Sequence, residues 1–481
     1  MSAPAAPAPA ARWAVPARWA EAVAAAAPER VGEVTRVHGL GLQVAGLECA
    51  VGDRVLLGEP AGVPGAGAGA ALPGAGVPGA GMPGAAAGAV EAEVVSSSSA
   101  RADCVPVTAA PGLRPGAPAR LRRSTPTVPT GAAVLGRILN GLGEPVDGLG
   151  PLRGAGRSPL ERPAPHPLDR ERITQPLATG VRVLDTLTTL GRGQRMGLFA
   201  GSGVGKSSLL SMVARGTEAE VNVIALIGER GREVREFLED DLGPEGLARS
   251  VVVVATADEP ALMRRRAAFT ATAIAAAFRD EGRHAVLMVD SLTRVAMAQR
   301  EIGLSAGEPP ATRGYPPSVF AVLAGLLERA GTDRTGSVTG VYTVLVDGDD
   351  HNEPIADTAR SILDGHVVLD RRLATAGHFP SVDVLGSVSR VAAKVTGPGE
   401  RAAAAALRRV LAARRDAQDL IDVGAYQAGA NPLVDAALAH QDAIDAFLRQ
   451  GMDESTPAPE AWARLAGLAQ TLTGAPAGVL A

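Results

Sequence analysis

One glycine-rich segment, residues 201–208, constrains the fold of this chain more than any other feature. The apolar residues 196–200 before it predict a short buried strand, and residues 206–215 after it predict a helix. In the order strand, glycine loop and helix, backbone N–H groups and the helix N-terminus can surround a phosphate. The sequence therefore predicts a phosphate-binding loop in an α/β domain. The loop consists of Gly201, Ser202, Gly203, Val204, Gly205, Lys206, Ser207 and Ser208.

Lys206 has the most specific role in such a loop, because its ammonium reaches the outer phosphates of a nucleotide. It is one of only two lysines among 47 basic residues, so a compact ammonium is kept where arginine serves elsewhere. Ser207 would place its hydroxyl on Mg²⁺. Ala200 stands where the strict motif has glycine, and a chain with 58 glycines contains glycine-rich strings by chance. A flexible loop without a ligand is therefore the alternative, which the flanking strand and helix disfavour.

The composition argues against several other classes of protein. A length of 481 residues with 46% hydrophobic residues allows two or three domains and a large core. The net charge of −4, without basic stripes, gives no support to nucleic-acid binding, so no nucleic-acid partner is expected. Cys49 and Cys104 are too few for a disulfide framework and are expected to be buried, reduced thiols of a cytoplasmic protein. Neither a signal peptide nor a membrane span is expected.

The N-terminal part of the chain predicts two regions. Residues 1–30 place Trp13 and Trp19 beside an alanine-rich stretch, and both a frayed tail and a docking helix with aromatic anchors fit this pattern. Residues 31–125 contain short β-rich runs with glycine-rich turns, which predict a small β-barrel. Residues 58–88 repeat Pro-Gly-Ala and predict a disordered insertion in this barrel, because they cannot bury a core.

The sequence pattern changes over residues 126–397, where apolar runs alternate with helical stretches. Such alternation predicts βαβ units, and hence a mostly parallel sheet with helices on both faces. Residues 398–481 predict a helical domain, with one helix over residues 436–449. In the α/β region, strands are expected at residues 221–227, 251–255, 285–289 and 341–346, and helices at residues 232–242, 261–278 and 320–330.

Two carboxylates that follow predicted strands are candidates for the chemistry. Asp290 ends the apolar run 286–289, and α/β sheets bind ligands at the carboxyl ends of their strands. We expect Asp290 to hold Mg²⁺ through water, with Ser207 as the other protein ligand. Glu229 follows another strand at the same edge and can accept a hydrogen bond from an attacking water. A solvated charged turn is an equal alternative for Glu229, because residues 228–233 are mostly charged.

Two further residues have weaker support from the pattern alone. Phosphoryl transfer needs positive charge at the transition state, and Arg390 can supply it. Phe379, one of seven phenylalanines, precedes Pro380 and can stack on a base. From spacing alone, core packing of Phe379 and a surface ion pair of Arg390 are the simpler interpretations.

Longer stretches of the chain resemble the ATPase of bacterial type III protein export, a family homologous to the subunits of rotary ATP synthases. The resemblance is strong from residue 131 to residue 429 and weaker in the barrel and the tail. Within the family, the chain is more similar to the flagellar branch than to the injectisome branch. The matching segments are residues 191–200, 228–234, 290–294, 307–320, 362–366 and 424–429.

The resemblance implies a RecA-like P-loop core with an N-terminal barrel and a C-terminal helical domain. It implies that Glu229 is the catalytic carboxylate, that Arg230 lies near the γ-phosphate of ATP, and that Phe379 contacts the adenine. It also implies that Arg390 is an arginine finger for the neighbouring subunit's site. Since one chain then carries both the site and the finger, a homohexameric ring that hydrolyses ATP with Mg²⁺ is implied.

The resemblance further implies partners and a location. The expected partners are a stator-like regulatory dimer, a central stalk-like protein, the membrane proteins of the export gate and chaperone–substrate complexes. The chain is then cytoplasmic and peripheral at the inner face of the cell membrane, where ATP hydrolysis drives the unfolding and entry of exported subunits. The alternatives are an injectisome ATPase, a synthase β-subunit, a ring-shaped nucleic-acid motor and a scaffold whose hydrolysis is dispensable. The proline-rich run at 307–320 and the finger on the same chain argue against the synthase β-subunit.

Overall fold

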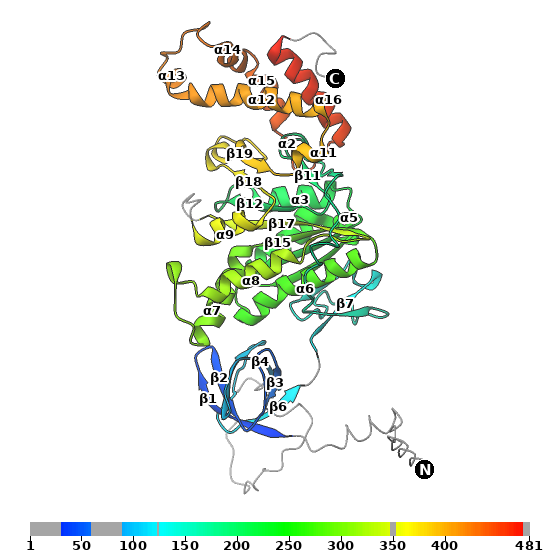
Figure 1. Cartoon of the computed structure of the whole chain (residues 1–481), viewed down its shortest axis with the longest axis vertical. Coiled ribbons are helices and arrows are strands. Elements are labelled where there is room, and N and C mark those ends of the chain that lie inside the picture. Colours follow the sequence, from blue (N-terminus) through cyan, green and yellow to red (C-terminus); the bar gives the residue numbers. More distant parts are fainter. Residues whose placement is uncertain (1–29, 59–88, 123–124, 347–352, 475–481) are drawn as a thin grey trace, which may run out of the picture. The chain divides into compact units, whose positions relative to one another are not determined.

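Two compact units make up the described part of the chain (Figure 1). Among the described residues, one unit contains those up to Cys104 together with residues 110–122, and the other contains the remainder. The computed structural model describes residues 30–58, 89–122, 125–346 and 353–474. The docking helix expected around Trp13 and Trp19 lies outside these residues, as does the expected insertion at 58–88 apart from Gly58. Among the helices of the described stretches, none is both long and apolar enough to cross a membrane.

The first unit is a closed barrel with the strand order β1-β2-β5-β4-β3-β6. Alternate residues of β4 face the interior, so that Val90, Ala92 and Val94 are buried. Both cysteines are free thiols, and the expectation of burial is right for Cys104 but wrong for Cys49, which is half-buried. The strands are β1 (Val31–His38), β2 (Gly41–Ala45), β3 (Arg54–Leu57), β4 (Val90–Ser97), β5 (Arg101–Pro106) and β6 (Pro118–Arg122).

A nine-stranded sheet with the order β19-β18-β12-β17-β15-β13-β14-β8 lies at the centre of the second unit, with β16 paired to β17. The pairs from β18 to β8 are parallel, and β19 and β16 are antiparallel to their neighbours. Every residue of β13 and β15 is buried, as expected where helices cover both faces. The strands are β8 (Ile138–Asn140), β12 (Arg195–Ala200), β13 (Val221–Ile227), β14 (Ser250–Ala255), β15 (His284–Asp290), β16 (Gly331–Thr332), β17 (Ser337–Leu345), β18 (Gly365–Leu369) and β19 (Val382–Ser389).

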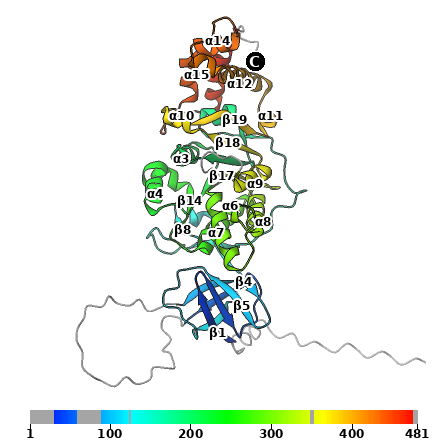
Figure 2. The ribbon, with the colours of Figure 1, turned by 90° about the vertical axis from the view of Figure 1, so that its left-hand side faces the viewer.

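Helices cover both faces of this sheet, as the βαβ pattern predicts. Helix α6 packs against β13, β14 and β15, and α7 packs against α6 and α8. Helices α3 and α4 lie on the opposite side of the sheet from α8 and α9 (Figure 2). The helix expected at 232–242 is a short α-helix, α4, that continues as a π-helical turn, η2. The helices are α2 (Arg182–Leu187), α3 (Lys206–Gly216), α4 (Gly231–Glu236), η2 (Phe237–Leu242), α5 (Gly243–Ala248), α6 (Ala261–Asp280), α7 (Leu292–Ser305), α8 (Pro317–Glu328), α9 (Pro354–Ile362), α10 (Arg371–Thr375) and α11 (Ala392–Val395).

Smaller elements of the second unit lie between its larger strands and helices along the chain. Two short antiparallel pairs are separate from the nine-stranded sheet, and two 3₁₀ turns lie in loops between larger elements. The pairs are β7 (Thr127–Thr130) with β9 (Gly156–Pro159) and β10 (Pro176–Leu177) with β11 (Leu190–Gly191), and the turns are η1 (Ala132–Val134) and η3 (Thr312–Gly314).

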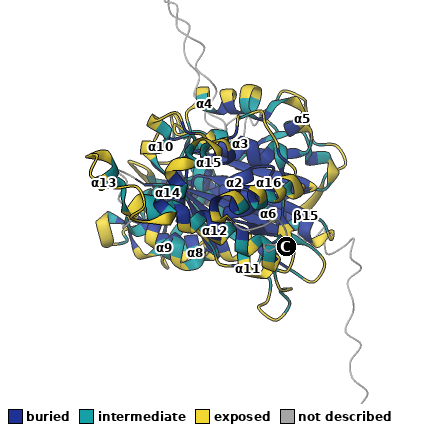
Figure 3. Cartoon of the chain, turned by 90° about the horizontal axis from the view of Figure 1, so that it is seen from above, coloured by how far each residue is buried: buried dark blue, intermediate teal, exposed yellow. Residues whose placement is uncertain are grey.

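The C-terminal helices pack on one another and on α2 of the core. Leu407 and Phe447 belong to one hydrophobic cluster with residues of the sheet, whereas α13 has no buried residue (Figure 3). The prediction of one helix over 436–449 is wrong, because His440, with φ −115° and ψ 23°, separates α14 from α15. The predicted border between residues 397 and 398 stays a prediction, since the core and these helices form one compact unit. The helices are α12 (Pro398–Asp416), α13 (Gln418–Asp422), α14 (Pro432–Ala439), α15 (Gln441–Leu448) and α16 (Ala458–Thr473).

Candidate nucleotide site

The loop between β12 and α3 has the backbone geometry of a phosphate site. Gly203 and Gly205 have φ angles of 74° and 90°, which glycine adopts without strain. A Cβ atom at Gly203 would meet no neighbour within 4 Å, so the backbone conformation rather than crowding requires glycine there. Ser202, Gly203 and Ser207 are exposed, and α3 begins at Lys206. An open loop at a helix N-terminus suits an anion.

Three strands of the sheet bring one ammonium and two carboxylates together at this edge. Lys206 Nζ lies 2.5 Å from Asp290 Oδ1 and 3.4 Å from Glu229 Oε1. Lys206 follows β12, Asp290 ends β15 and Glu229 follows β13, and these strands are all parallel. The Glu229 side chain is only 18% exposed and is therefore not a solvated member of the charged turn, whereas the following Arg230 is 78% exposed. The sequence prediction that these residues meet at one edge is confirmed.

Burial and mutual charge set the protonation of this cluster. Burial disfavours the charged form of Lys206, but the charges of Asp290 and Glu229 outweigh it and raise the pKa of the ammonium. Burial raises the pKa of Glu229; Lys206 lowers it in part, and the charge of Asp290 raises it further. A carboxylate with a raised pKa is a better proton acceptor, which suits a group that orients a water.

Asp290 is fixed by a hydroxyl that sequence reasoning missed. Thr343 of β17 donates from Oγ1 to Asp290 Oδ1 at 2.8 Å. Strand β17 runs parallel to β15 with Tyr342 opposite Val289, which places Thr343 beside Asp290. Within the described stretches, no group of three or more His, Cys, Asp or Glu side chains is arranged to hold a metal ion. Mg²⁺ at this edge would therefore rely on Asp290, Ser207, phosphate oxygens and water, a donor set that Mg²⁺ accepts.

Phe379 lies beside the phosphate loop. A Cβ atom at Gly205 would come within 3.3 Å of Cδ1 and Cε1 of the Phe379 ring. Phe379 is 44% exposed, so the interpretation of core packing from its spacing is wrong. The ring is open to a planar ligand next to the loop.

Two residues near Phe379 in the sequence, Arg371 and Ser381, donate hydrogen bonds to the phosphate loop. Sequence reasoning identified neither of them. Ser381 Oγ donates to the Val204 carbonyl at 2.6 Å, and Arg371 Nη1 donates to the Ser202 carbonyl at 3.0 Å. The two contacts span 177 and 169 residues of sequence, so no local motif indicates them.

Two arginines lie near Glu229 in different surroundings. The Arg230 side chain is 78% exposed, and its Nη1 donates to Glu233 Oε1 at 2.9 Å. Arg294 of α7 lies over Gly228, where a Cβ atom would come within 3.0 Å of Arg294 Cγ. Its Nε is buried without a hydrogen-bond partner in the described structure. Sequence reasoning matched the segment that contains Arg294 but assigned it no role.

Arg390 lies at the opposite end of the sheet from the phosphate loop. It follows β19, whose Ser389 pairs with Gly365 at the start of β18. Strand β18 is parallel to β12, so Arg390 lies where these strands begin, and the loop follows where β12 ends. The six residues of β12 span about 17 Å. Arg390 is therefore remote from the phosphate loop of its own chain. The interpretation that Arg390 forms a surface ion pair is wrong, because no described carboxylate pairs with it.

A polar cavity of about 350 Å³ also lies at the end where the strands begin. His284 and Ser337, the first residues of β15 and β17, line it together with Arg192. His284 is the first residue of β15 and Asp290 is its last residue. The cavity and the candidate nucleotide site therefore lie at opposite ends of this strand and are separate.

Comparisons with known proteins agree with this arrangement. Residues 180–389 match the nucleotide-binding domain of the ATP synthase alpha/beta family, and residues 396–467 match the C-terminal domain of the T3SS ATPase EscN. The flagellum-specific ATP synthase of Bacillus subtilis is 51% identical over 381 residues, which cover 79% of this chain and 86% of the relative. The type 3 secretion system ATPase of Xanthomonas euvesicatoria is 54% identical over 327 residues, which cover 68% of this chain and 74% of the relative.

A solved structure extends the similarity to the fold. The assembled ATPase EscN from the type III secretion system of enteropathogenic E. coli has a TM-score of 0.82 and 38% identity. The match covers 91% of this chain and all of that chain, and EscN has also been solved with its central stalk EscO. The chain therefore belongs to the family of flagellum-specific ATP synthases and type 3 secretion system ATPases, enzymes that hydrolyse ATP.

Proposed function

We propose that this chain is the ATPase of a bacterial flagellar type III export apparatus and couples ATP hydrolysis to the unfolding and entry of exported subunits. The observation that most strongly supports ATP hydrolysis by this chain is the cluster of Lys206, Asp290 and Glu229 beside an open glycine loop. The flagellar assignment is supported by the Bacillus relative, which is 51% identical over 79% of this chain. The Xanthomonas relative, which is 54% identical over 68% of this chain, keeps the injectisome branch as the alternative.

The residues at the loop fit a magnesium nucleotide. The positive φ angles of Gly203 and Gly205 hold the loop open, so that its backbone can face phosphate oxygens. Ser207 is exposed in the first turn of α3, and Ser207 and Asp290 are the oxygen donors that would hold Mg²⁺. Bound Mg²⁺ neutralises charge on the phosphates. The exposed ring of Phe379 offers the adenine a stacking surface.

Glu229 would orient the attacking water and accept its hydrogen bond. Its carboxylate is mostly buried beside Lys206, so a water that it held would be shielded from bulk solvent. Lys206 would exchange its contacts with the two carboxylates for contacts with the outer phosphates when a nucleotide binds. Arg230 and Arg294 would add positive charge near the γ-phosphate, since one follows Glu229 directly and the other lies over Gly228.

A closed ring of identical subunits would complete each site. Arg390 and the phosphate loop lie at opposite ends of one sheet, so subunits arranged head to tail would present Arg390 to the next subunit's nucleotide. Such repeated contacts generate a ring when the rotation closes, and we propose a homohexamer. The relative EscN, an assembled ATPase with a central stalk, supports this by analogy.

The same analogy supplies the partners and the location. We assign a central stalk-like protein, a stator-like regulatory dimer, the export gate and chaperone–substrate complexes as partners. The chain would then be cytoplasmic and held at the inner face of the cell membrane through the export gate. A pull-down of tagged chain from its own cells tests this assignment. Flagellar chaperones support it, injectisome components indicate the other branch of the family, and a heteromeric synthase core overturns it.

Glu229→Gln tests the catalytic assignment directly. The amide keeps the size of the side chain but is a poor proton acceptor, so kcat should fall at least about 100-fold while ATP still binds. The measurements are Mg²⁺-dependent phosphate release and equilibrium binding of ATP. Glu236→Gln is the control, because Glu236 is an exposed glutamate of α4 paired with Arg232, and its turnover should not change. Unaltered turnover in Glu229→Gln would remove Glu229 from the mechanism.

A further inference from the structure

Arg390 is held by its backbone where β19 ends. Its amide N–H donates to the Asp364 carbonyl at 3.0 Å, and its Nη2 donates to the Arg360 carbonyl at 3.3 Å. The residue is otherwise exposed. The direction in which the guanidinium leaves the sheet therefore depends on the positions of Asp364 and of the preceding residue, Ser389.

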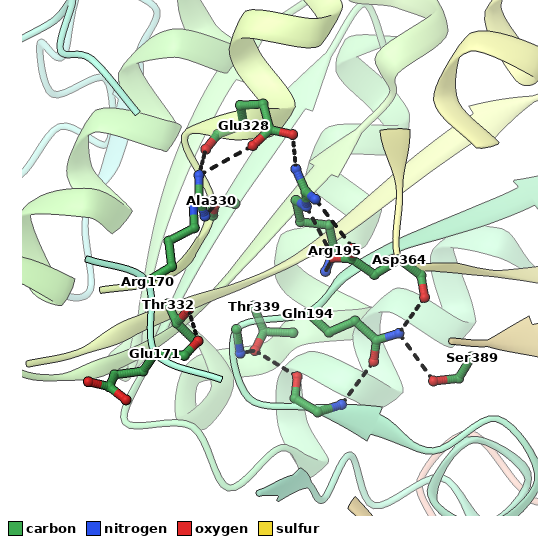
Figure 4. A network of polar contacts seen from close by, with 12 residues as sticks. Arg170, Glu171, Gln194, Arg195, Glu328, Ala330, Thr332, Thr339, Asp364 and Ser389 are labelled. Atoms are coloured by element: carbon green, nitrogen blue, oxygen red, sulfur yellow. Dashed lines mark hydrogen bonds and ion pairs between the residues drawn. The ribbon is translucent and has the colours of Figure 1, made fainter. Parts of the chain in front are cut away.

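A buried amide fixes both of these residues (Figure 4). Gln194 is 0% exposed and donates from Nε2 to the Asp364 carbonyl at 3.0 Å and to Ser389 Oγ at 3.1 Å. Its Oε1 accepts from the Gly191 N–H at 2.9 Å, and Ser389 Oγ donates onward to the Thr189 carbonyl at 2.7 Å. Because both N–H groups and the oxygen of the amide are bonded, the Gln194 side chain has one orientation.

The Asp364 carboxylate also bonds to Arg195, the first residue of β12. Asp364 Oδ2 accepts from the Arg195 backbone N–H at 3.0 Å and from Arg195 Nε at 3.1 Å, and Oδ1 accepts from Nη2 at 3.3 Å. In return, the Asp364 N–H donates to the Arg195 carbonyl at 2.8 Å. On its other side, the Arg195 guanidinium donates to Glu328 at 2.5 Å, and Arg170 pairs with the same glutamate (Figure 4). Asp364 is thus fixed through its amide, its carbonyl and its carboxylate.

Strand β12 gives this cluster a rigid base. It lies between β17 and β18, and every residue after Arg195 is buried. Its first residue contacts Asp364, and its last residue, Ala200, leads into the phosphate loop. A catalytic group must be held within a fraction of an ångström, and supporting contacts on rigid strands provide that precision.

We propose that Gln194 and Asp364 are positioning residues that aim Arg390 at the nucleotide of the neighbouring subunit. This inference rests on the proposed ring. An arginine misplaced by about 1 Å loses on the order of 100-fold in rate. We call the contacts of Gln194 and Asp364 with the segment of Arg390 the Arg390 clamp. The phosphate loop of the same chain is at the far end of β12, so nucleotide affinity should be spared when this clamp is damaged. The expected signature is a lower kcat with a nearly unchanged KM for ATP.

Asp364→Asn is the primary variant, because it keeps the shape of the side chain and removes the charge that holds Arg195. We expect a ten- to hundredfold loss of kcat, roughly. Asp147→Asn is the matched control, since Asp147 also bonds an arginine, Arg137, and the first backbone N–H of a strand, that of Ile138 in β8. Its kcat should not change.

Ser389→Ala is a milder second variant, which removes one of the two acceptors of the Gln194 amide. It should lower kcat in the same direction by a smaller factor. Wild-type kcat in both Asp364→Asn and Ser389→Ala would overturn the proposal.

Mixed rings separate positioning from folding. Asp364→Asn subunits mixed with Glu229→Gln subunits should exceed the activity of either alone, because some interfaces join an intact Glu229 to an intact Arg390 clamp. Asp364→Asn mixed with Arg390→Ala should show no gain, since every subunit then has either a damaged clamp or no finger.

Two outcomes would contradict this account. If Arg390→Ala with Glu229→Gln recovers activity and Asp364→Asn with Glu229→Gln does not, the positioning role is wrong and the proposed function stands. If neither mixture recovers although mixed rings form, the finger itself is wrong.

Discussion

Lys206 contacts two carboxylates with different proposed tasks, and the small size of its ammonium makes this geometry feasible. Nζ lies 2.5 Å from Asp290 and 3.4 Å from Glu229. A guanidinium is a planar fork that prefers to pair with one carboxylate through two parallel bonds. Arginine at this position would therefore favour one carboxylate and displace the other, even though the charge is the same.

Lys206→Arg should lower ATP turnover by at least about 100-fold, the order of loss seen when one transition-state donor is misplaced. The chain offers a matched control in its other lysine, Lys394, which is exposed on α11. Lys394→Arg should keep wild-type turnover. Phosphate release at saturating Mg²⁺ and ATP measures both variants, and thermal unfolding checks that both are folded. Turnover near the wild-type level in Lys206→Arg would mean that any cation serves at this position.

At the scale of elements, the two ends of β15 have different chemistry. Asp290 ends the strand at the candidate nucleotide site, and His284 begins it beside the polar cavity. His284 is buried, its Nδ1 lies 2.6 Å from Ser337 Oγ, and its Nε2 has no partner in the described structure. Burial, together with the charge of Arg192, lowers the pKa of His284 to about 4.

This lowered pKa makes the stability of the sheet depend on pH. As the pH falls, His284 becomes protonated in the unfolded chain near its ordinary pKa of 6.5, but in the folded chain only at a lower pH. The neutral imidazole therefore contributes stability above pH 6.5 that is lost as the pH falls toward 4, up to about 3 kcal/mol. The urea midpoint should fall over this range, and less steeply in His284→Gln. His166→Gln changes an exposed histidine and should follow the wild type, and equal slopes in all three proteins would contradict the prediction.

Five strands of the sheet, β12, β13, β14, β15 and β17, could be predicted because each contains a run of apolar residues. The other four, β8, β16, β18 and β19, were not predicted, because they are short or interrupted by polar residues. The positions of Lys206, Glu229 and Asp290 at the ends of strands follow from that pattern. The catalytic role of Glu229 came from the family resemblance, because the pattern left a solvated charged turn as an equal alternative. Thr343 could not be predicted, because its contact with Asp290 depends on the order of the strands in the sheet. The break at His440 was missed because neither proline nor glycine marks it.

At the scale of the whole molecule, one sheet separates two halves of a proposed composite site. The phosphate loop, Asp290 and Glu229 lie where the parallel strands end, and Arg390 lies where they begin. Neither half is complete without the other, since phosphoryl transfer needs the cradle and the extra positive charge together. The activity of each subunit should therefore depend on its neighbour.

Mixing Glu229→Gln and Arg390→Ala subunits tests this dependence. Each variant alone should be nearly inactive, because every interface lacks either the carboxylate or the finger. In a random ring, an interface works only where a subunit with intact Glu229 meets a neighbour with intact Arg390, so activity should peak at equal amounts, at about one quarter of the wild type. Glu229→Gln mixed with Lys206→Arg is the control without recovery, because both changes damage the same half of the site. Mixed rings that are detected by native mass spectrometry and still remain inactive would show that Arg390 does not act on the neighbouring subunit.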